Sequence, residues 1–241
     1  MQFYRRLQPI RAISFDLDDT LYDNIPVMRA AEAANYAKLC ELFPVAAAWS
    51  QAEWAQRRWQ LMQTDADLAS DMTLLRLATI RLGLMQLGID SKQAEAGAEQ
   101  VLAAFLARRN QVDVPAQSHQ LLSELGQHYP LIAISNGNVD TTKIGLRDYF
   151  THVIQPGDGR RGKPYPDMFT VAQQAYPHLC PAQWLHVGDS PVADVLGAQR
   201  MGWQTAWFKS GLYDASSLIV LPHVAYHDNR QLGHLLLERQ R

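Results

Sequence analysis

Cysteine is scarce in this chain of 241 residues, and neither sign of charge is in excess. Its two cysteines, Cys40 and Cys180, stand far apart and in no metal-ligand spacing, so a reducing cytoplasm is the expected setting. The formal net charge of −2 gives no electrostatic case for nucleic-acid binding. No uninterrupted apolar run approaches the ~20 residues of a membrane span, and the first residues lack a signal-peptide core. We therefore expect neither a membrane segment nor export.

Helix-forming residues dominate the second quarter of the chain. From about residue 25 to 109 the sequence is rich in Ala, Leu, Gln, Glu and Arg, and it shows no strand-like alternation. Asp71 and Ser91 are the expected N-caps of two helices in this region. The region is predicted to be a four-helix insert.

Apolar runs alternate with helical segments in the rest of the chain. Short apolar runs occupy residues 12–15, 131–134, 152–154, 185–187 and 205–208. Helical segments at 117–126, 167–176 and 192–202 separate the later runs. This alternation predicts an α/β fold, with a mostly parallel sheet covered by helices on both faces. The expected core is 1–21 with 113–241, and the expected helical domain is 22–112.

An acidic cluster follows the first apolar run. Asp16, Asp18 and Asp19 lie within the sequence DLDDT, where close packing and partial burial would raise their pKa values. A bound divalent cation would offset that cost. Asp16 and Asp18 point to the same side of an extended backbone, so one could attack while the other moves a proton. The spacing excludes an EF-hand calcium loop, because Leu21 stands where that loop needs Gly.

Ser135, Asn136 and Gly137 end the second of the apolar runs. A hydroxyl and backbone N–H groups at this point could hold a phosphate, and glycine permits its close approach. The alternative is an Asn-Gly hairpin turn, but residues 138–143 show no alternating pattern for a second strand.

Lys163 stands in a loop that two prolines stiffen, where a fixed ammonium could offset the charge of a phosphoryl group and of nearby aspartates. The glycines at 157, 159 and 162 match the dinucleotide-binding fingerprint. That fingerprint requires a helix to open at once, and Pro164 and Pro166 prevent this. A mobile, basic loop is the preferred interpretation of 157–162.

Asp189 and Asp194 follow the run at 185–187 and form a second acidic pair. Magnesium prefers such hard oxygen ligands: Asp189 is the expected direct ligand, and Asp194 a direct or outer-shell one. Asp16, Ser135 and Asp189 each end a predicted strand, the edge at which open α/β sheets bind ligands. His186 is interpreted as a core histidine.

Taken in order, Asp16 with Asp18 and Thr20, then Ser135, Lys163, and Asp189 with Asp194 resemble the four motifs of the haloacid dehalogenase superfamily. The resemblance covers the whole chain. It implies a Rossmann-like, three-layer core with a helical cap inserted after the first motif. It further implies a Mg²⁺-dependent phosphomonoester hydrolase that forms an aspartyl-phosphate. The implied nucleophile is Asp16 and the implied acid–base group is Asp18. The implied phosphate-binding residues are Ser135, Asn136 and Lys163, and the implied metal ligands are Asp16, Asp18 through its carbonyl, Asp189 and Asp194.

Within that superfamily, residues 15–24 resemble the opening of the bacterial YigB-type phosphatases. This implies a small phosphorylated metabolite as substrate, either flavin mononucleotide or 5-amino-6-(5-phospho-D-ribitylamino)uracil, and so a step of riboflavin biosynthesis. Tyr22 and Asn24 are expected to contact the leaving group. Two alternatives stay open: a sugar-phosphate phosphatase or phosphomutase, and a non-catalytic phospho-sensor resembling receiver domains. The sequence does not fix an oligomeric state, and it is compatible with a monomer.

Overall fold

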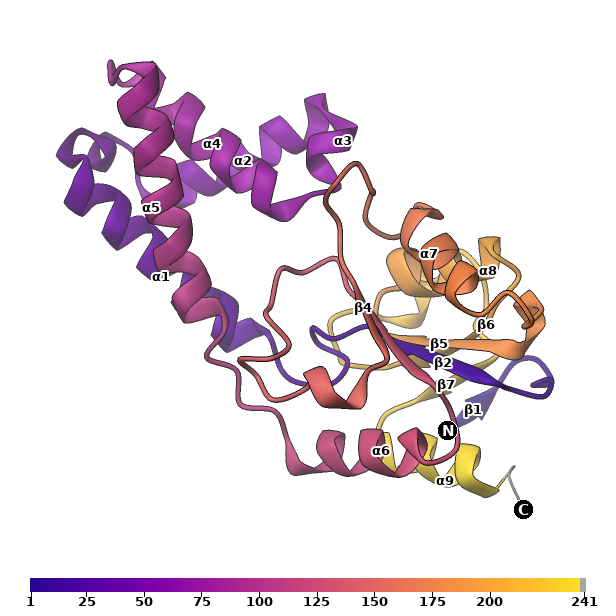
Figure 1. Cartoon of the computed structure of the whole chain (residues 1–241). Helices are drawn as coiled ribbons and strands as arrows, with labels where there is room; N and C mark the ends of the chain where they lie inside the picture. Colours follow the sequence, from indigo (N-terminus) through magenta and orange to yellow (C-terminus); the bar gives the residue numbers. More distant parts are fainter. Residues whose placement is uncertain (239–241) are drawn as a thin grey trace. The chain divides into compact units, whose positions relative to one another are not determined.

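Seven strands form a single sheet in the computed structural model, which describes residues 1–238 (Figure 1). Their order is β1-β7-β6-β5-β2-β3-β4, and neighbouring strands are parallel except for the β1–β7 pair. The strands are β1 (Gln2–Phe3), β2 (Ala12–Phe15), β3 (Leu131–Ile134), β4 (His152–Ile154), β5 (Trp184–Gly188), β6 (Gln204–Phe208) and β7 (Val224–Tyr226). The predicted α/β fold with a mostly parallel sheet is confirmed. The edge strand β1 and its partner β7 were not predicted.

The central strands β5, β2 and β3 are buried along their whole length. Continuous apolar runs are typical of parallel strands covered on both faces, which is why these strands could be predicted. Phe15 is in register with Ala133 on one side and with Val187 on the other. The residues that follow these three strands therefore emerge together at one edge of the sheet.

Helices cover both faces of this sheet, α7 and α8 on one side and α6 and α9 on the other (Figure 1). They are α6 (Ala116–Gly126), α7 (Asp167–Ala175), α8 (Gly197–Arg200) and α9 (Asn229–Glu238). Short 3-10 turns lie at Arg147–Tyr149, Pro181–Gln183 and Ala215–Ser217. The predicted helix at 192–202 is divided into a π-helical segment, η4 (Pro191–Leu196), and the short α8.

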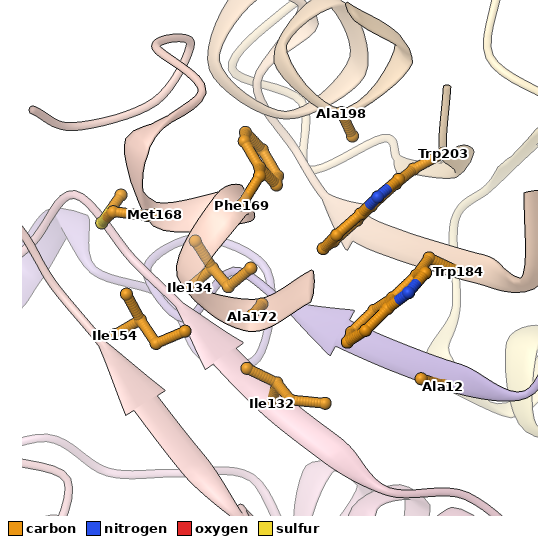
Figure 2. Close-up of a cluster of buried hydrophobic side chains, with 10 residues drawn as sticks. All are labelled: Ala12, Ile132, Ile134, Ile154, Met168, Phe169, Ala172, Trp184, Ala198 and Trp203. Atoms are coloured by element: carbon orange, nitrogen blue, oxygen red, sulfur yellow. The ribbon is translucent and has the colours of Figure 1, made fainter. Parts of the chain in front are cut away.

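Aromatic packing fixes the core beneath α7 and α8. The rings of Trp184 and Trp203 are stacked (Figure 2). Their centroids are 4.4 Å apart and their planes meet at 11°. Phe169 of α7 meets Trp203 edge-on at 5.3 Å. Ile132 and Ile134 of β3 complete this cluster from the sheet. Such aromatic pairs add about 0.5–1.5 kcal/mol to the stabilisation from burial alone.

The chain divides into two compact units. The sheet unit comprises Met1–Asp23, Asp113–Gly137 and the described residues from Thr141 onward, and the helical unit comprises Asn24–Val112 with Asn138–Asp140. Residues 138–140 join the helical unit although they follow β3, because Asn138 Nδ2 donates to Thr73 Oγ1 (3.1 Å) and Asp140 N donates to Asn110 Oδ1 (2.7 Å). That assignment differs from the predicted boundary, which placed these residues in the core.

Four long helices build the part of the helical unit between residues 24 and 112, all of which the structure describes. They are α1 (Ile25–Leu42), α2 (Gln51–Thr64), α4 (Met72–Gln86) and α5 (Ser91–Arg109), joined by a 3-10 turn (Pro44–Ala48) and the short α3 (Ala66–Ala69). Asp71 caps α4 as predicted. The predicted cap Ser91 is wrong: Asp90 caps α5, its carboxylate accepting from the N–H groups of Lys92 and Gln93. None of the helices within 1–238 is long and apolar enough to span a membrane.

A partly buried ion cluster ties three of these helices together. Glu32 of α1 accepts hydrogen bonds from Arg76 of α4 (2.8 and 3.1 Å) and from Arg58 of α2 (2.8 and 3.3 Å). Burial alone would raise the pKa of Glu32, but the hydrogen bonds and charges of Arg76 and Arg58 outweigh it and lower that pKa. The side chain of Arg76 is only 6% exposed, so its charge depends on Glu32 for compensation.

Replacing Glu32 with glutamine should therefore lower the free energy of unfolding by about 3 kcal/mol, because it leaves a buried guanidinium without its counter-charge. Urea unfolding followed by circular dichroism measures this effect. The matched control is Glu41→Gln, which breaks the exposed Lys38–Glu41 pair and should hardly move the midpoint. Because the folded-state pKa of Glu32 is lowered, its contribution is lost as the pH falls, and wild type and Glu32→Gln should converge in acid. Equal midpoints at neutral pH would contradict this account.

Candidate active site

Three buried carboxylates meet at the edge of the sheet where β2 and β5 end. Asp16 follows β2, Asp189 follows β5, and Asp194 lies in η4. One carboxylate oxygen from each lies within 4.8 Å of the others. Asp16 N donates to Val187 O (2.8 Å), which extends the β2–β5 ladder to the first of these carboxylates. Three of the predicted site residues thus come together from segments far apart in the sequence.

Gly188 makes room for this arrangement. A Cβ atom at this position would lie 2.2 Å from Cγ of Asp194, so any side chain would displace that carboxylate. Asp194 is held in turn by the Ser190 backbone N–H, which donates to Oδ2 (2.8 Å). The close approach of Asp194 thereby explains why a glycine ends β5, directly before Asp189.

Lys163 lies between two of the carboxylates. Its Nζ donates to Asp16 Oδ1 (2.7 Å), Asp194 Oδ1 (2.7 Å) and the Ile134 carbonyl (2.6 Å), and the side chain is 1% exposed. All three ammonium hydrogens therefore have acceptors. The lysine predicted from a loop motif is a fully engaged buried cation in the structure.

Asn136 holds the main chain of Lys163 on both sides. Its Oδ1 accepts from Lys163 N (2.7 Å), and its Nδ2 donates to Lys163 O (2.8 Å). Both polar atoms of the Asn136 side-chain amide are thus engaged with the backbone of Lys163. The role of the side chain in placing Lys163 was not predicted, because it depends on a return of the chain 27 residues later.

Ser135 is buried directly after β3, where its N–H donates to Ile154 O (3.2 Å). Its Oγ accepts from Gly137 N (3.2 Å), which closes a short turn over residues 135–137. Since β3 pairs with β2 in parallel, Ser135 leaves the sheet at the same edge as Asp16. Its position fits the predicted phosphate-binding turn.

The loop after Asp16 is a tight turn. The N–H groups of Thr20 and Leu21 both donate to Leu17 O, at 3.4 and 2.9 Å. Asp19 adopts a left-handed backbone with φ of 57°, which aspartate tolerates better than most residues. The third acidic residue of the cluster thus shapes the turn that presents Asp18.

Residues 157–160, within the segment expected to be a mobile, basic loop, form a tight two-residue turn. Gly157 and Arg160 exchange both backbone hydrogen bonds (3.2 and 3.0 Å). Asp158 and Gly159 between them have positive φ angles of 53° and 80°, as a type I′ turn requires. The next helix, α7, begins only at Asp167, in line with rejection of the dinucleotide fingerprint.

His186 is buried, as predicted, but it also holds Asp194. Its Nε2 lies 3.0 Å from Asp194 Oδ1, and its Nδ1 lies 2.7 Å from Ser14 Oγ. Burial lowers the pKa of His186, so the ring is neutral at pH 7. A carboxylate only accepts, so Nε2 donates to Asp194 and Nδ1 accepts from Ser14. The signal was in the sequence: Ser14 and His186 are polar residues in apolar strands, and the two are paired in register.

Asp189 is supported from β6. Ser210 Oγ donates to its Oδ2 (3.1 Å), and Trp207 Nε1 donates to its backbone carbonyl (2.7 Å). Neither supporting residue was predicted. Burial first, and then the charge of Asp194, raises the pKa of Asp189 to about 7.

The charges of this centre do not balance. Three carboxylates and the Lys163 ammonium leave a net charge of −2 when all are ionised. Burial raises the pKa of Asp16 well above its usual range, an effect that Lys163 opposes and Asp194 and Asp18 reinforce. Burial alone would lower the pKa of Lys163, but Asp16 and Asp194 outweigh it and raise that pKa. A divalent cation would cancel the excess negative charge.

The donor set fits magnesium, which prefers carboxylate and carbonyl oxygens and keeps several waters. The two oxygens of Asp194 already accept from Lys163, His186 and the Ser190 N–H. Asp16 and Asp189 are therefore the better direct ligands, and Asp194 is better suited to holding Lys163.

Comparisons with known proteins agree on one family. A family model for haloacid dehalogenase-like hydrolases matches residues 10–202. The chain is 34% identical over 227 residues to the 5-amino-6-(5-phospho-D-ribitylamino)uracil phosphatase YigB of Escherichia coli, covering 93% of this chain and 95% of that protein. It is 27% identical to the phosphoserine phosphatase of Thermus thermophilus, over 84% of this chain and 90% of that one. Among solved structures, a 2-haloacid dehalogenase from Pseudomonas syringae superposes with a TM-score of 0.85 at 31% identity, covering 95% of this chain and 99% of the other.

Proposed function

Because this chain belongs to the haloacid dehalogenase-like hydrolase family, we propose that it is a magnesium-dependent phosphatase of small metabolites that works through an aspartyl-phosphate. The sheet unit is the catalytic core in this proposal, and the helical unit is a cap that sets substrate preference. The single observation that carries the proposal is the position of Asp16. It is a buried carboxylate held by a lysine, in a centre with excess negative charge, and a second carboxylate follows two residues later.

The chemistry needs two steps, and Asp16 and Asp18 divide them. In the first, a carboxylate oxygen of Asp16 bonds to phosphorus, and the bond from phosphorus to the ester oxygen breaks. The electron pair leaves with that oxygen, which takes a proton from Asp18. In the second, water attacks phosphorus, its proton passes to Asp18, and the bond to Asp16 breaks. The sum is ester plus water to alcohol plus phosphate.

Other residues of the centre would bind and orient the phosphoryl group. Ser135 Oγ, the Asn136 N–H and Lys163 would hold its oxygens, with Asn136 keeping Lys163 in place through its side chain. A magnesium ion bound by Asp16, the Asp18 carbonyl and Asp189 would supply positive charge between two anionic reactants. Asp194 would orient Lys163 from outside the metal shell.

Dehalogenation is the second candidate, because the Pseudomonas syringae structure carries that name. Asp18 argues against it here. A departing halide is a weak base that needs no proton, whereas a departing alkoxide needs one, and Asp18 is placed to give it. Halide release from a 2-chloro acid without phosphate release from any ester would reverse this choice.

The substrate proposed first is 5-amino-6-(5-phospho-D-ribitylamino)uracil, which the Escherichia coli relative is named for, with flavin mononucleotide as the second. Both carry a phosphate on a ribityl chain. The test is a phosphate-release assay over these two compounds, sugar phosphates, phosphoserine and nucleotides, with magnesium and with EDTA. Turnover of a ribityl phosphate that EDTA abolishes is the expected result. Turnover that survives EDTA would refute the metal requirement, and preference for a sugar phosphate would refute the substrate.

Magnesium binding should weaken in acid. Since the pKa of Asp189 lies at about 7 without metal, a proton competes with the ion below that pH. The apparent affinity should fall about tenfold per pH unit below 7 and level off above it. Calorimetric titration of magnesium on either side of pH 7 measures this. Asp189→Asn should bind magnesium more weakly and lose the part of this pH dependence that Asp189 contributes, while the raised pKa of Asp16 leaves the rest. A pH-independent affinity of the wild type would contradict the role of Asp189.

A further inference from the structure

Tyr22 meets the second carboxylate of the acidic cluster. Its hydroxyl donates to Asp18 Oδ1 at 2.7 Å, and the residue is 3% exposed. The turn between them, closed by hydrogen bonds to Leu17 O, brings the backbones of Asp18 and Tyr22 into a bridge. The sequence led us to expect that Tyr22 contacts the leaving group. In the structure the ring is buried and its hydroxyl is bonded to Asp18.

The hydrogen bond distinguishes the two oxygens of Asp18. A protonated carboxyl has one donor, and Oδ1 is already accepting from the tyrosine hydroxyl. The hydrogen bond therefore favours Oδ2 as the oxygen that carries the proton for transfer. The buried ring has few conformations, so it also fixes the plane of a carboxyl that is itself only half-buried. Proton transfer depends steeply on such alignment, because the donor must lie within hydrogen-bond reach of the leaving oxygen.

We propose that Tyr22 is a positioning residue that holds Asp18 with Oδ2 directed at the leaving group, a role that rests on the phosphatase function proposed above. Tyr22 should contribute only to the transfer of the proton from Asp18 to the leaving group. It should matter for esters whose alcohol leaves as a strong base, and hardly at all for esters whose alcohol leaves as a stable anion.

The test is Tyr22→Phe, which removes one hydroxyl. We would measure kcat/KM, which reports phosphoryl transfer, for p-nitrophenyl phosphate, phenyl phosphate and an alkyl phosphate such as glycerol phosphate. The loss should grow along that series, from less than about 3-fold for the nitrophenyl ester to about 10–100-fold for the alkyl ester, a share of what general acid catalysis typically supplies.

Tyr129→Phe is the matched control. Its hydroxyl is also buried in the sheet unit and donates to a backbone carbonyl, that of Leu236 (3.1 Å). Both variants should lower the thermal midpoint by similar amounts, but Tyr129→Phe should change kcat/KM equally for every ester. A double-mutant cycle gives a second measurement: in an Asp18→Asn background, Tyr22→Phe should add no further leaving-group dependence.

The outcomes separate the two proposals. A wild type that releases phosphate from none of these esters or from the metabolite panel refutes the phosphatase itself. Wild-type turnover with a uniform loss in Tyr22→Phe, or no loss, refutes only the role of Tyr22. A leaving-group-dependent loss that persists in the Asp18→Asn background also refutes it, because Tyr22 would then act without Asp18.

Discussion

Asp16→Asn should release phosphate at least about 10³-fold more slowly than the wild type while remaining folded. An amide is a poor nucleophile, so the covalent step is lost. The side chain keeps its shape, and its carbonyl oxygen can still accept from Lys163. The substitution also removes one charge from a centre with excess negative charge, so the metal-free variant should be at least as stable as the wild type. Lower activity with equal or greater stability is typical of residues placed for chemistry.

Three measurements check this expectation. Phosphate release gives the rate, thermal unfolding without magnesium gives the stability, and radiolabelled phosphate on acid-quenched protein reports the covalent intermediate. The wild type should retain label, and Asp16→Asn should not. Asp148→Asn, the same change at an exposed position of the sheet unit, should behave like the wild type. Label on Asp16→Asn, or turnover above about 1% of the wild-type rate, would show that another residue is the nucleophile.

The strands that lead to the candidate site could be predicted from the sequence, for a physical reason. The strands before Asp16, Ser135 and Asp189 are buried on both faces. Such strands are continuous apolar runs, which are easily recognised in an amino-acid sequence. Parallel strands end at a common edge of the sheet. Predicting the strands was therefore enough to predict that the residues directly after them lie close together. The edge strand β1 was missed because two residues carry too little pattern to detect, and its partner β7 was missed with it.

The contacts that hold these residues in place could not be predicted in the same way. Asn136 reaches Lys163 only because the chain leaves β4 and returns through the turn at 157–160. Asp189 depends on Trp207 and Ser210 because β6 lies beside β5 in the sheet. Each of these bonds joins residues that are neighbours in space through the path of the chain and the order of the strands, which local patterns do not encode. The sequence therefore predicted the candidate reacting groups, and the structure shows the contacts that hold them.

Lys163→Met should be the most damaging single substitution of a charged residue in the sheet unit, for both stability and activity. Lys163 is the buried cation between Asp16 and Asp194, and both pairs have N–O distances of 2.7 Å. Methionine fills a similar volume but leaves the buried carboxylates without that charge. Removing one partner of a buried ion pair typically costs about 3–5 kcal/mol, so we expect a loss of that size in the free energy of unfolding at neutral pH. Turnover should fall at least about 10²-fold, since the phosphoryl group also loses a fixed positive charge.

The pH dependence identifies the cause of that loss. In the wild type the charge of Lys163 helps to lower the pKa of Asp194 and opposes the rise in the pKa of Asp16. Without Lys163, burial and mutual repulsion should raise the pKa values of these carboxyls in the folded state. A group with a raised folded pKa stabilises the fold below its unfolded pKa, and this contribution is lost as the pH rises. Lys163→Met should therefore recover stability as the pH falls below neutrality. Saturating magnesium should also restore part of it, because a cation bound to the folded state replaces some of the missing charge.

Two further variants test whether the loss of positive charge alone explains the lower stability and turnover of Lys163→Met. Lys143→Met, the same change at an exposed position of the sheet unit, should alter neither the unfolding midpoint nor turnover. Lys163→Arg keeps the charge, but its planar guanidinium cannot meet the three acceptors that surround Nζ, so it should recover part of the stability and little of the turnover. A Lys163→Met protein as stable as the wild type at neutral pH, with no gain in acid, would mean that the carboxylates are already protonated in the folded wild type. The excess negative charge inferred for this centre, and with it the argument for a divalent cation, would then be wrong.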